Sequence, residues 1–363
     1  MKIGILTFHC AHNFGAILQA YALQEQLRRL GHTPIILNYR PLYLDKGEPK
    51  LHYWMFTRGR ALDTIKRYFK STRKLIKSYK LYRQFENDFL TLTQPCKVPF
   101  QLAQQAYDCD YLILGSDQIW NPQFNGNEDV WFGNIEHFKG NKATYAASSG
   151  SDKLNIEQEK ILKKQLTHFK AFGIREEALA KSLKSIVDTD IPLSVVLDPT
   201  LMVNPQIWES MFNYKPKGKY ILVYQARKCD ELFNIAQKAA NYYQAEIISV
   251  DFWDNSFKKG IKQKAISPNE FVSYVRHAEC VITTSFHGTA FSLICNTPFY
   301  SVRLNAPSDD RIMSLLSQVE LLDRFIDKDC LPSFDQIDFN RANKILEEKR
   351  TNSITFLENI FKQ

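Results

Sequence analysis

The sequence predicts an α/β protein built from two Rossmann-like domains that face each other across a cleft. Apolar runs of strand length alternate with amphipathic helical patterns in both halves of the chain, which is typical of parallel sheets covered by helices. The 363 residues suffice for two domains of ordinary size. Residues 203–218 interrupt the alternation, and we expect the chain to cross between the domains there.

The predicted N-terminal domain covers residues 1–205 and contains a basic helical insertion at about 40–100. Its first forty residues read as a β–α–β unit whose helix ends near Gly31. The turn of this unit lacks the GxGxxG pattern of dinucleotide-binding proteins. The expected strands are 2–8, 33–39, 111–114, 144–147, 172–174 and 194–200, and the expected helices are 16–32, one from about 155, and 176–183.

The predicted C-terminal domain covers residues 206–340, and a lysine-rich helix over 341–363 closes the chain. The alternation resumes here with strands at 220–224, 246–250, 281–282 and 298–302 and with helices at 230–243, 269–277, 290–295 and 311–322. We expect the carboxyl ends of the strands to carry the functional side chains, because parallel sheets bind ligands at that edge.

The composition is that of a soluble globular protein, with 44% hydrophobic and 24% charged residues. Residues 1–6 read as a strand rather than a signal peptide, and no apolar stretch is long enough to cross a bilayer. The seven cysteines lack CxxC spacing, so we expect mostly buried, reduced thiols in a cytosolic protein. No metal site is expected, because no carboxylate or Cys/His cluster has ligand spacing.

The chain has a net charge of +8, and positive charge is concentrated in residues 58–83, which hold ten Lys/Arg against one acid, Asp63. Apolar residues recur between these cations at helical spacing. Such a basic amphipathic helix is typical of a surface for anionic lipid, and it is equally typical of a solvated helix packed on its own domain. Nucleic acid is the weaker interpretation, because no binding motif accompanies the charge.

The main candidate for chemistry is His287, in the turn between a short strand and an apolar helix. Ser285, Gly288 and Thr289 surround it, and the free backbone N–H groups of a helix start suit an anion. Two later arginines are further candidates: Arg303 within a strand, and Arg311 at a helix start, where a cation opposes the helix dipole unless an anion is bound.

In the predicted N-terminal domain, Arg175 ends a short strand and offers a planar fork for carboxylate or phosphate. A salt bridge to Glu176, Glu177 or Asp198 explains it equally well. The loop after strand 111–114 gathers groups that suit a sugar, or that merely satisfy their own backbone. These are Ser116, Asp117, Gln118, Trp120 and Asn121, and His12, Asn13 and Gly15 lie at the corresponding edge of the first unit.

Taken together, these segments resemble the polysaccharide pyruvyl transferase family. The resemblance is carried by TFHCAHNFGAILQAYALQEQL, LILGSDQIWNP, the arginine of FGIREEAL, VVLDPTLM and TTSFHGTAFSLICNTPF, in the family's order. Arg175 matches the family's arginine, and His287 matches the histidine before its HG helix. Many relatives place a lysine or arginine about twenty residues later, where this chain has Pro307. Arg311 is the nearest substitute and Arg303 the second.

The resemblance implies the GT-B-like arrangement of two Rossmann-like domains and transfer of a pyruvyl group from phosphoenolpyruvate to a sugar as a ketal. His287, Arg175 and Arg311 would then be catalytic. Ser285, Gly288, Thr289 and Arg303 would bind the donor, and the two N-terminal loops the acceptor. The implied acceptor is an undecaprenyl-diphosphate-linked glycan of a bacterial capsule or exopolysaccharide, with a galactose 4,6-ketal as the common product. No cofactor is implied, and residues 58–83 would bring a cytoplasmic enzyme to the inner membrane face.

Two other functions fit the sequence. A GT-B glycosyltransferase would share the fold and use a nucleotide sugar, although no acidic ribose-binding position follows the histidine helix. A non-catalytic glycan-binding protein would retain the fold without the chemistry, and Pro307 is compatible with that reading. The polar groups kept at all three motif turns favour an enzyme.

Overall fold

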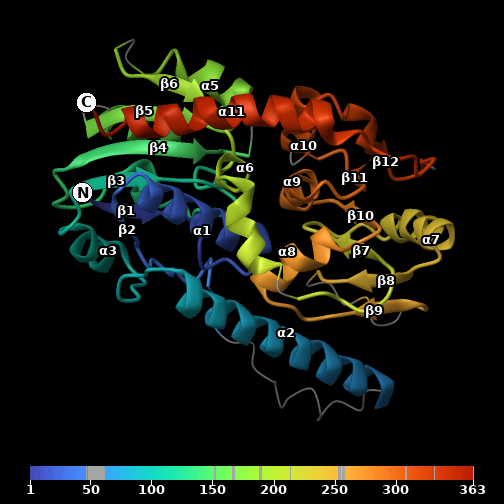
Figure 1. Cartoon of the computed structure of the whole chain (residues 1–363). Helices are drawn as coiled ribbons and strands as arrows, with labels where there is room; N and C mark the ends of the chain where they lie inside the picture. The colour runs from blue at the N-terminus through green and yellow to red at the C-terminus, as the bar shows by residue number, and fades with distance from the viewer. Residues whose placement is uncertain are drawn as a thin grey trace. The chain divides into compact units, whose positions relative to one another are not determined.

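The computed structural model describes residues 1–45, 47, 62–150, 153–165, 168–187, 190–212, 214–251, 255, 258–306, 309–330 and 332–362, with only the backbone of 62–70. Within these residues the chain forms two six-stranded sheets whose neighbouring strands all run parallel. Helices alternate with the strands of both sheets (Figure 1). The two Rossmann-like domains predicted from the sequence are therefore confirmed.

The first sheet has the strand order β2–β1–β3–β4–β5–β6. From β1 the chain proceeds to β2 on one side, whereas from β3 it proceeds to β4 on the other side. This reversal between β1 and β3 is a topological switch point, the place where open α/β sheets bind ligands. The strands are β1 (Lys2–Leu6), β2 (Thr33–Ile36), β3 (Tyr111–Leu114), β4 (Asn141–Ala147), β5 (Phe169–Ile174) and β6 (Leu193–Val195).

The second sheet has the order β12–β11–β10–β7–β8–β9, so its switch point lies between β7 and β10. Four-residue and five-residue strands that are buried along their whole length, such as YILVY in β7 and CVIT in β10, explain why these segments are continuously apolar. The strands are β7 (Tyr220–Tyr224), β8 (Glu246–Ser249), β9 (Ile261–Gln263), β10 (Cys280–Thr283), β11 (Phe299–Arg303) and β12 (Phe325–Asp327).

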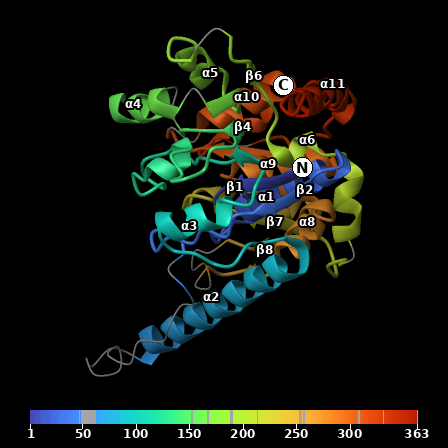
Figure 2. The same cartoon turned by 90° about the vertical axis from the view of Figure 1, so that its left-hand side faces the viewer.

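The helices of the chain vary from single turns to long rods, and the helices α2 and α11 are the longest (Figures 1 and 2). The α-helices are α1 (Phe14–Arg29), α2 (Leu62–Phe89), α3 (Pro99–Ala106), α4 (Ile156–Gln165), α5 (Glu177–Leu183), α6 (Pro199–Met202), α7 (Leu232–Tyr243), α8 (Pro268–Arg276), α9 (Phe286–Cys295), α10 (Asp309–Gln318) and α11 (Phe339–Asn359). The 3-10 helices are η2 (Asp129–Phe132), η4 (Pro205–Met211) and η5 (Leu322–Arg324). No helix among the described residues is both long and apolar enough to cross a membrane.

The chain divides into two compact units, and each unit contains one sheet. The first unit comprises Met1–Asp45, Phe89–Asn204 and Lys344–Gln363, and the second comprises Lys46–Asp88 and Pro205–Asn343. The main boundary lies in the segment where the sequence predicts a crossover. Two assignments differ from the sequence-based division: most of the basic insertion belongs to the second unit, and most of the closing helix belongs to the first.

Contacts within each unit explain these two assignments. Helix α11 packs on the first sheet so closely that a methyl group at Gly173 would lie 2.7 Å from the ring of Phe356. Arg350 Nε also donates to the carbonyl of Leu201 at 3.2 Å. In the second unit, Lys74 of α2 donates to the carbonyl of Asp251, which follows β8. Both long helices are therefore held by sheets that are distant from them in sequence.

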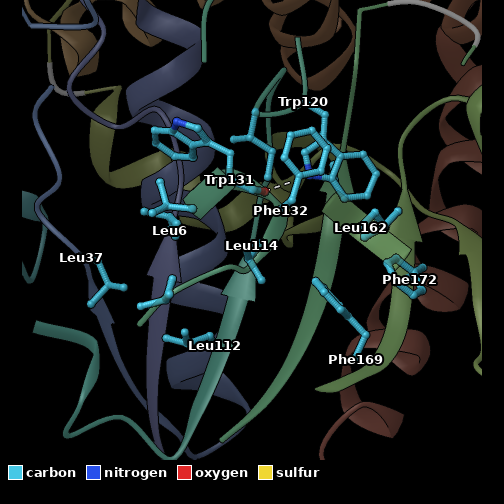
Figure 3. Close-up of a cluster of buried hydrophobic side chains, with 14 of the residues drawn as sticks. Leu6, Leu37, Leu112, Leu114, Trp120, Trp131, Phe132, Leu162, Phe169 and Phe172 are labelled. Carbon is cyan, nitrogen blue, oxygen red and sulfur yellow. Dashed lines mark hydrogen bonds between the residues drawn. The ribbon is translucent and has the colours of Figure 1, made fainter. Parts of the chain in front are cut away.

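The core of the first unit is rich in aromatic side chains (Figure 3). Trp120 is fully buried, stacks on Phe132 with ring centroids 5.6 Å apart, and donates from Nε1 to the carbonyl of Trp131 at 2.9 Å. The ring predicted to lie beside a sugar is therefore used for packing. Six of the seven cysteines are buried as free thiols, as expected from their apolar surroundings, and Cys330 is exposed.

The edge strands were the hardest elements to foresee. β9 and β12 have three residues each, and the partly exposed IKQ and FID carry no alternation long enough to predict a strand. β4 and β5 begin earlier than predicted. Helix α9 begins four residues earlier than predicted, so His287 belongs to the helix and not to the preceding turn.

We expect Leu357→Ala in α11 to lower the free energy of unfolding by about 2–5 kcal/mol, because Leu357 is fully buried and the change leaves a cavity. The control is Thr355→Ala on the exposed face of the same helix, which should change it by less than about 0.5 kcal/mol. Urea denaturation followed by fluorescence measures both. Equal stability of the two variants would contradict the packing of α11 on the first sheet.

Candidate functional site

The start of helix α9 lies at the switch point of the second sheet, directly after β10. Ser285 is its N-cap, and the side-chain oxygen of Ser285 accepts a hydrogen bond from the backbone N of Gly288 at 3.4 Å. This cap lets the helix begin at Phe286 and explains why it starts before its apolar pattern does. The remaining backbone N–H groups of the first turn and the positive end of the helix dipole favour an anion here.

His287 lies in the first turn of α9 and is 5% exposed. Its ring meets that of Phe286 edge-on, with centroids 5.2 Å apart. The structure therefore places the imidazole next to the helix N-terminus, as the sequence predicts. An imidazole in this position can hold or release a proton beside a bound anion.

The neighbours of His287 mostly hold the unit together. A methyl group at Gly288 would lie 2.3 Å from Oγ1 of Thr283, and that hydroxyl donates to the carbonyl of Tyr224 at 2.7 Å. The glycine thus lets the helix approach β10. Thr289 Oγ1 lies 2.7 Å from the hydroxyl of Ser301. Gly288 and Thr289 therefore serve the helix–strand contact, and their backbone N–H groups are both bonded to Ser285, so the N–H groups of Phe286 and His287 are the ones of this turn suited to a ligand.

The structure separates the two arginines that follow α9. Arg311 lies in the first turn of α10, and its guanidinium carbon is 5.7 Å from the centroid of the Phe286 ring, so it belongs to the neighbourhood of His287. Arg303 lies at the end of β11, where Nη1 is 3.3 Å from a carboxylate oxygen of Asp327 on β12. Pro307 is outside the described residues.

A further cation at this edge, Arg227, was missed by the sequence analysis. It follows β7 on the other side of the switch point and is exposed. Its backbone N and O both lie near Oγ1 of Thr284, which donates to the carbonyl of Arg227 at 3.0 Å. The loop after β7 is thereby tied to the turn that precedes α9. A basic pair, Arg227-Lys228, directly after a buried strand was the signal in the sequence.

In the first unit, Arg175 directly follows β5 and is surrounded by carboxylates. Its side chain is 4% exposed, Nη1 is 3.0 Å from Asp198 Oδ2, and Nε is 3.1 Å from Glu176 Oε1. Asp117 Oδ1 lies 4.0 Å from Nη1. Burial alone would lower the pKa of the guanidinium, and the carboxylates of Glu176, Asp198 and Asp117 outweigh it and raise the pKa. Of the three salt bridges that the sequence allowed as an alternative, those to Glu176 and Asp198 are present.

Other predicted acceptor residues surround the switch point of the first sheet. Ser116 is buried, and its carbonyl accepts a hydrogen bond from Thr7 Oγ1 at 3.0 Å, which links the loops after β1 and β3. Asn121 Nδ2 donates to Gln118 Oε1 at 2.6 Å. Much of this loop therefore satisfies itself, whereas Asp117 and Gln118 remain partly exposed.

The start of α1 shows the same pattern. Asn13 is the N-cap, and its Oδ1 accepts from the backbone N of Gly15 at 2.8 Å and of Ala16 at 3.3 Å. Gly15 is buried within the helix, and His12 is partly exposed in the preceding loop. Asn13 is partly exposed as well, and Nε2 of His12 is buried. Across the described part of the chain, no group of three or more His, Cys, Asp or Glu side chains is placed to hold a metal ion.

Replacing Gly288 by alanine should destabilise the second unit by about 1–3 kcal/mol, the usual cost of overpacking. The added methyl would collide with Oγ1 and the β-carbon of Thr283, which β10 and its bond to Tyr224 hold in place. Thermal unfolding measures the effect. An unchanged unfolding midpoint would show that α9 does not press against β10 as described.

Comparison with known proteins gives a family and a set of structural likenesses. The profile of the family described as polysaccharide pyruvyl transferase matches residues 13–305. No curated protein matches the chain. The chain is similar to UDP-GlcNAc 2-epimerase of Methanocaldococcus jannaschii, at 13% identity and a TM-score of 0.47 over 99% of this chain and 93% of that one.

Two further solved structures are similar at the same low level. UDP-GlcNAc 2-epimerase of Neisseria meningitidis matches at 10% identity and a TM-score of 0.44, over 96% of this chain and 99% of that one. UGT2 of Phytolacca americana matches at 11% identity and a TM-score of 0.42, over 99% and 93%. The family profile spans the turn at Asp117, Arg175 and the histidine helix. The chain belongs to the polysaccharide pyruvyl transferase family.

Proposed function

We propose that the protein transfers a pyruvyl group from phosphoenolpyruvate to two hydroxyl groups of a sugar, forming a cyclic ketal and releasing phosphate. Membership of the family carries this proposal, and the placement of His287 in the first turn of α9 supports it. The acceptor sugar we propose is a galactose, capped as a 4,6-ketal, in a lipid-diphosphate-linked repeat unit of a bacterial capsule or exopolysaccharide.

The second unit has the charge that the donor requires. Phosphoenolpyruvate carries a carboxylate and a phosphate, and anions of this kind bind at helix N-termini and to arginine. The start of α9 offers backbone N–H groups, Arg311 lies over Phe286 beside them, and Arg227 is tied to Thr284 across the switch point. Arg311 and Arg227 thus supply the cations of the proposed donor site.

The proposed chemistry needs an acid beside the donor. Protonation of the methylene carbon of phosphoenolpyruvate makes its C2 electrophilic, after which a sugar hydroxyl can add to C2 and phosphate can leave. His287 is the proposed acid, because an imidazole can donate a proton and His287 lies in the first turn of α9, where the anionic donor is proposed to bind. No cofactor is required by these steps.

The direct test measures phosphate release from phosphoenolpyruvate with and without galactosyl acceptors, followed by proton NMR of the product. Acceptor-dependent phosphate together with a new ketal methyl signal would support the proposal. If nucleotide sugars raise the melting temperature of the protein and phosphoenolpyruvate does not, a glycosyltransferase replaces it, because only a ligand of the folded state stabilises it.

His287→Ala should lower the turnover number at least about a hundredfold, the usual contribution of acid–base catalysis. The matched control is His277→Ala. His277 ends α8, and its ring nitrogen is bonded to the carbonyl of Ser273 at 2.9 Å, so it has no place in the chemistry. A His287→Ala enzyme with near-normal turnover would remove this residue from the mechanism.

We also propose that α2 brings a cytoplasmic enzyme to the inner face of the membrane. Ser78, Tyr82 and Phe85 of this helix are buried. Arg73, Lys77 and Lys80 are exposed and follow helical spacing, so they lie on one side of the helix. The side chains of residues 58–70 are outside the described residues. Packing thus concerns the buried side chains of α2, and the proposed lipid binding concerns the exposed cations.

Replacing Arg73, Lys77 and Lys80 by glutamine should weaken binding to phosphatidylglycerol-containing vesicles by about a hundredfold, because each cation near an anionic surface contributes about 1 kcal/mol. Co-sedimentation measures this. Glutamine at three exposed lysines of α4, Lys160, Lys163 and Lys164, is the control with equal charge loss. If both triple variants bind alike, α2 does not direct the enzyme to the lipid.

A further inference from the structure

The turn after β3 holds one carboxylate, Asp117, at the switch point of the first sheet. Its φ of 70° lies in the left-handed region, which residues other than glycine seldom adopt. Hydrogen bonds fix it there: the carbonyl of Asp117 accepts from Ser148 N at 3.1 Å, and its backbone N donates to Ser116 Oγ at 2.6 Å. The position of Asp117 therefore depends on the ends of both β3 and β4.

The two oxygens of this carboxylate have different surroundings. Oδ1 accepts from the backbone N of Gln118 at 2.9 Å and faces Arg175. No hydrogen bond from the described residues reaches Oδ2, and 17% of the side chain is exposed. By contrast, Asp198 is fully engaged, because Oδ1 accepts from Thr200 and Oδ2 from Arg175. Glu176 accepts from Ser148 and Arg175 at Oε1, and its Oε2 is buried. Among the carboxylates around Arg175, Asp117 is therefore the one whose unbonded oxygen is not buried.

The surroundings of Arg175 disfavour an anionic donor in this unit. A single buried guanidinium faces three carboxylates, Glu176, Asp198 and Asp117, so negative charge exceeds positive charge. A phosphate or carboxylate brought here would be repelled, and the repulsion is strong where water is excluded. An uncharged sugar hydroxyl, in contrast, donates a strong hydrogen bond to a carboxylate. This edge of the first sheet therefore suits the uncharged sugar acceptor.

We propose that Asp117 is the catalytic base that takes the proton from the acceptor hydroxyl, and that Arg175 is a positioning residue whose guanidinium faces Asp117 Oδ1 and orients the carboxylate. This inference rests on the proposed function and deepens it. It also moves Arg175, which the sequence predicts to be catalytic toward the donor, to a supporting role on the acceptor side.

The proton balance of the reaction requires such a base. One proton is added to the methylene carbon of phosphoenolpyruvate, and the C2–O bond to phosphate breaks with its electron pair leaving on phosphate. Two sugar hydroxyls form bonds to C2, and each loses a proton. One of these protons restores the acid that protonated the methylene carbon. The other passes through Asp117 Oδ2 and leaves with the phosphate, as HPO₄²⁻.

The test compares Asp117→Asn with wild type under three readouts: ketal formation, binding of phosphoenolpyruvate by thermal shift, and the pH dependence of the rate. Asparagine keeps the acceptor at Oδ1 and removes the charge. We expect transfer to fall by 10²–10⁴-fold, the range for a general base, with donor binding unchanged. The control is Asp108→Asn, an exposed aspartate before the opposite end of the same strand.

The role of Arg175 is tested by Arg175→Gln, first shown to be folded by thermal unfolding. Arg175 is the cation that faces Asp117, and Glu176 and Asp198 are the neighbouring anions. Removing the cation takes away the group that faces Asp117 Oδ1 and orients its carboxylate. We therefore expect the turnover number to fall while the dissociation constant of phosphoenolpyruvate stays unchanged. An unchanged turnover number, or a loss of phosphoenolpyruvate binding as large as the loss of turnover, would overturn the positioning role.

The outcomes separate this inference from the proposed function. Failure of wild type to form a ketal with any acceptor would overturn both. An active wild type together with an active Asp117→Asn enzyme would overturn the base alone. If Asp117→Asn loses phosphoenolpyruvate binding as strongly as it loses transfer, the role as base is also overturned, because Asp117 would then bind the donor.

Discussion

The constraint on which this protein depends is the strand order of its two parallel sheets. In each sheet, two adjacent strands lead the chain away in opposite directions, β1 and β3 in the first and β7 and β10 in the second. The segments that follow these strands begin at the same edge of the sheet, the carboxyl edge, and hydrogen bonds join them. Thr7 is bonded to Ser116 in one unit, and Thr284 to Arg227 in the other. Asp117 and His287 both belong to these linked segments.

The two units share this topology, but the charges around their switch points have opposite sign. Around α9, a helix N-terminus, His287 and two arginines favour negative charge. Around the turn at Asp117, three carboxylates surround one buried arginine and favour a hydrogen-bond donor. A reaction between a highly charged donor and an uncharged sugar needs both kinds of surface. We infer that the two sheets divide this task, with Arg175 on the acceptor side.

Much of the fold was predictable because buried parallel strands are continuously apolar and their helices are amphipathic. The histidine helix was predictable for the same reason, although its first turn was not: FHG is not apolar throughout, and the cap at Ser285 rather than the pattern sets the start. Local sequence could not predict that the ring of Trp120 packs against Phe132 in the core. It also could not choose between the two roles of Arg175. Those outcomes depend on residues such as Asp198 that are distant along the chain.

The measurement that tests this division most directly is the dissociation constant of phosphoenolpyruvate, by calorimetry, for Arg311→Gln and Arg175→Lys. A hydrogen bond to a charged group contributes about 1.5–3 kcal/mol. We therefore predict that Arg311→Gln weakens donor binding at least about tenfold, since 1.4 kcal/mol is a factor of ten, whereas Arg175→Lys leaves it within about twofold. The reverse order, with binding lost in Arg175→Lys and kept in Arg311→Gln, would contradict the account.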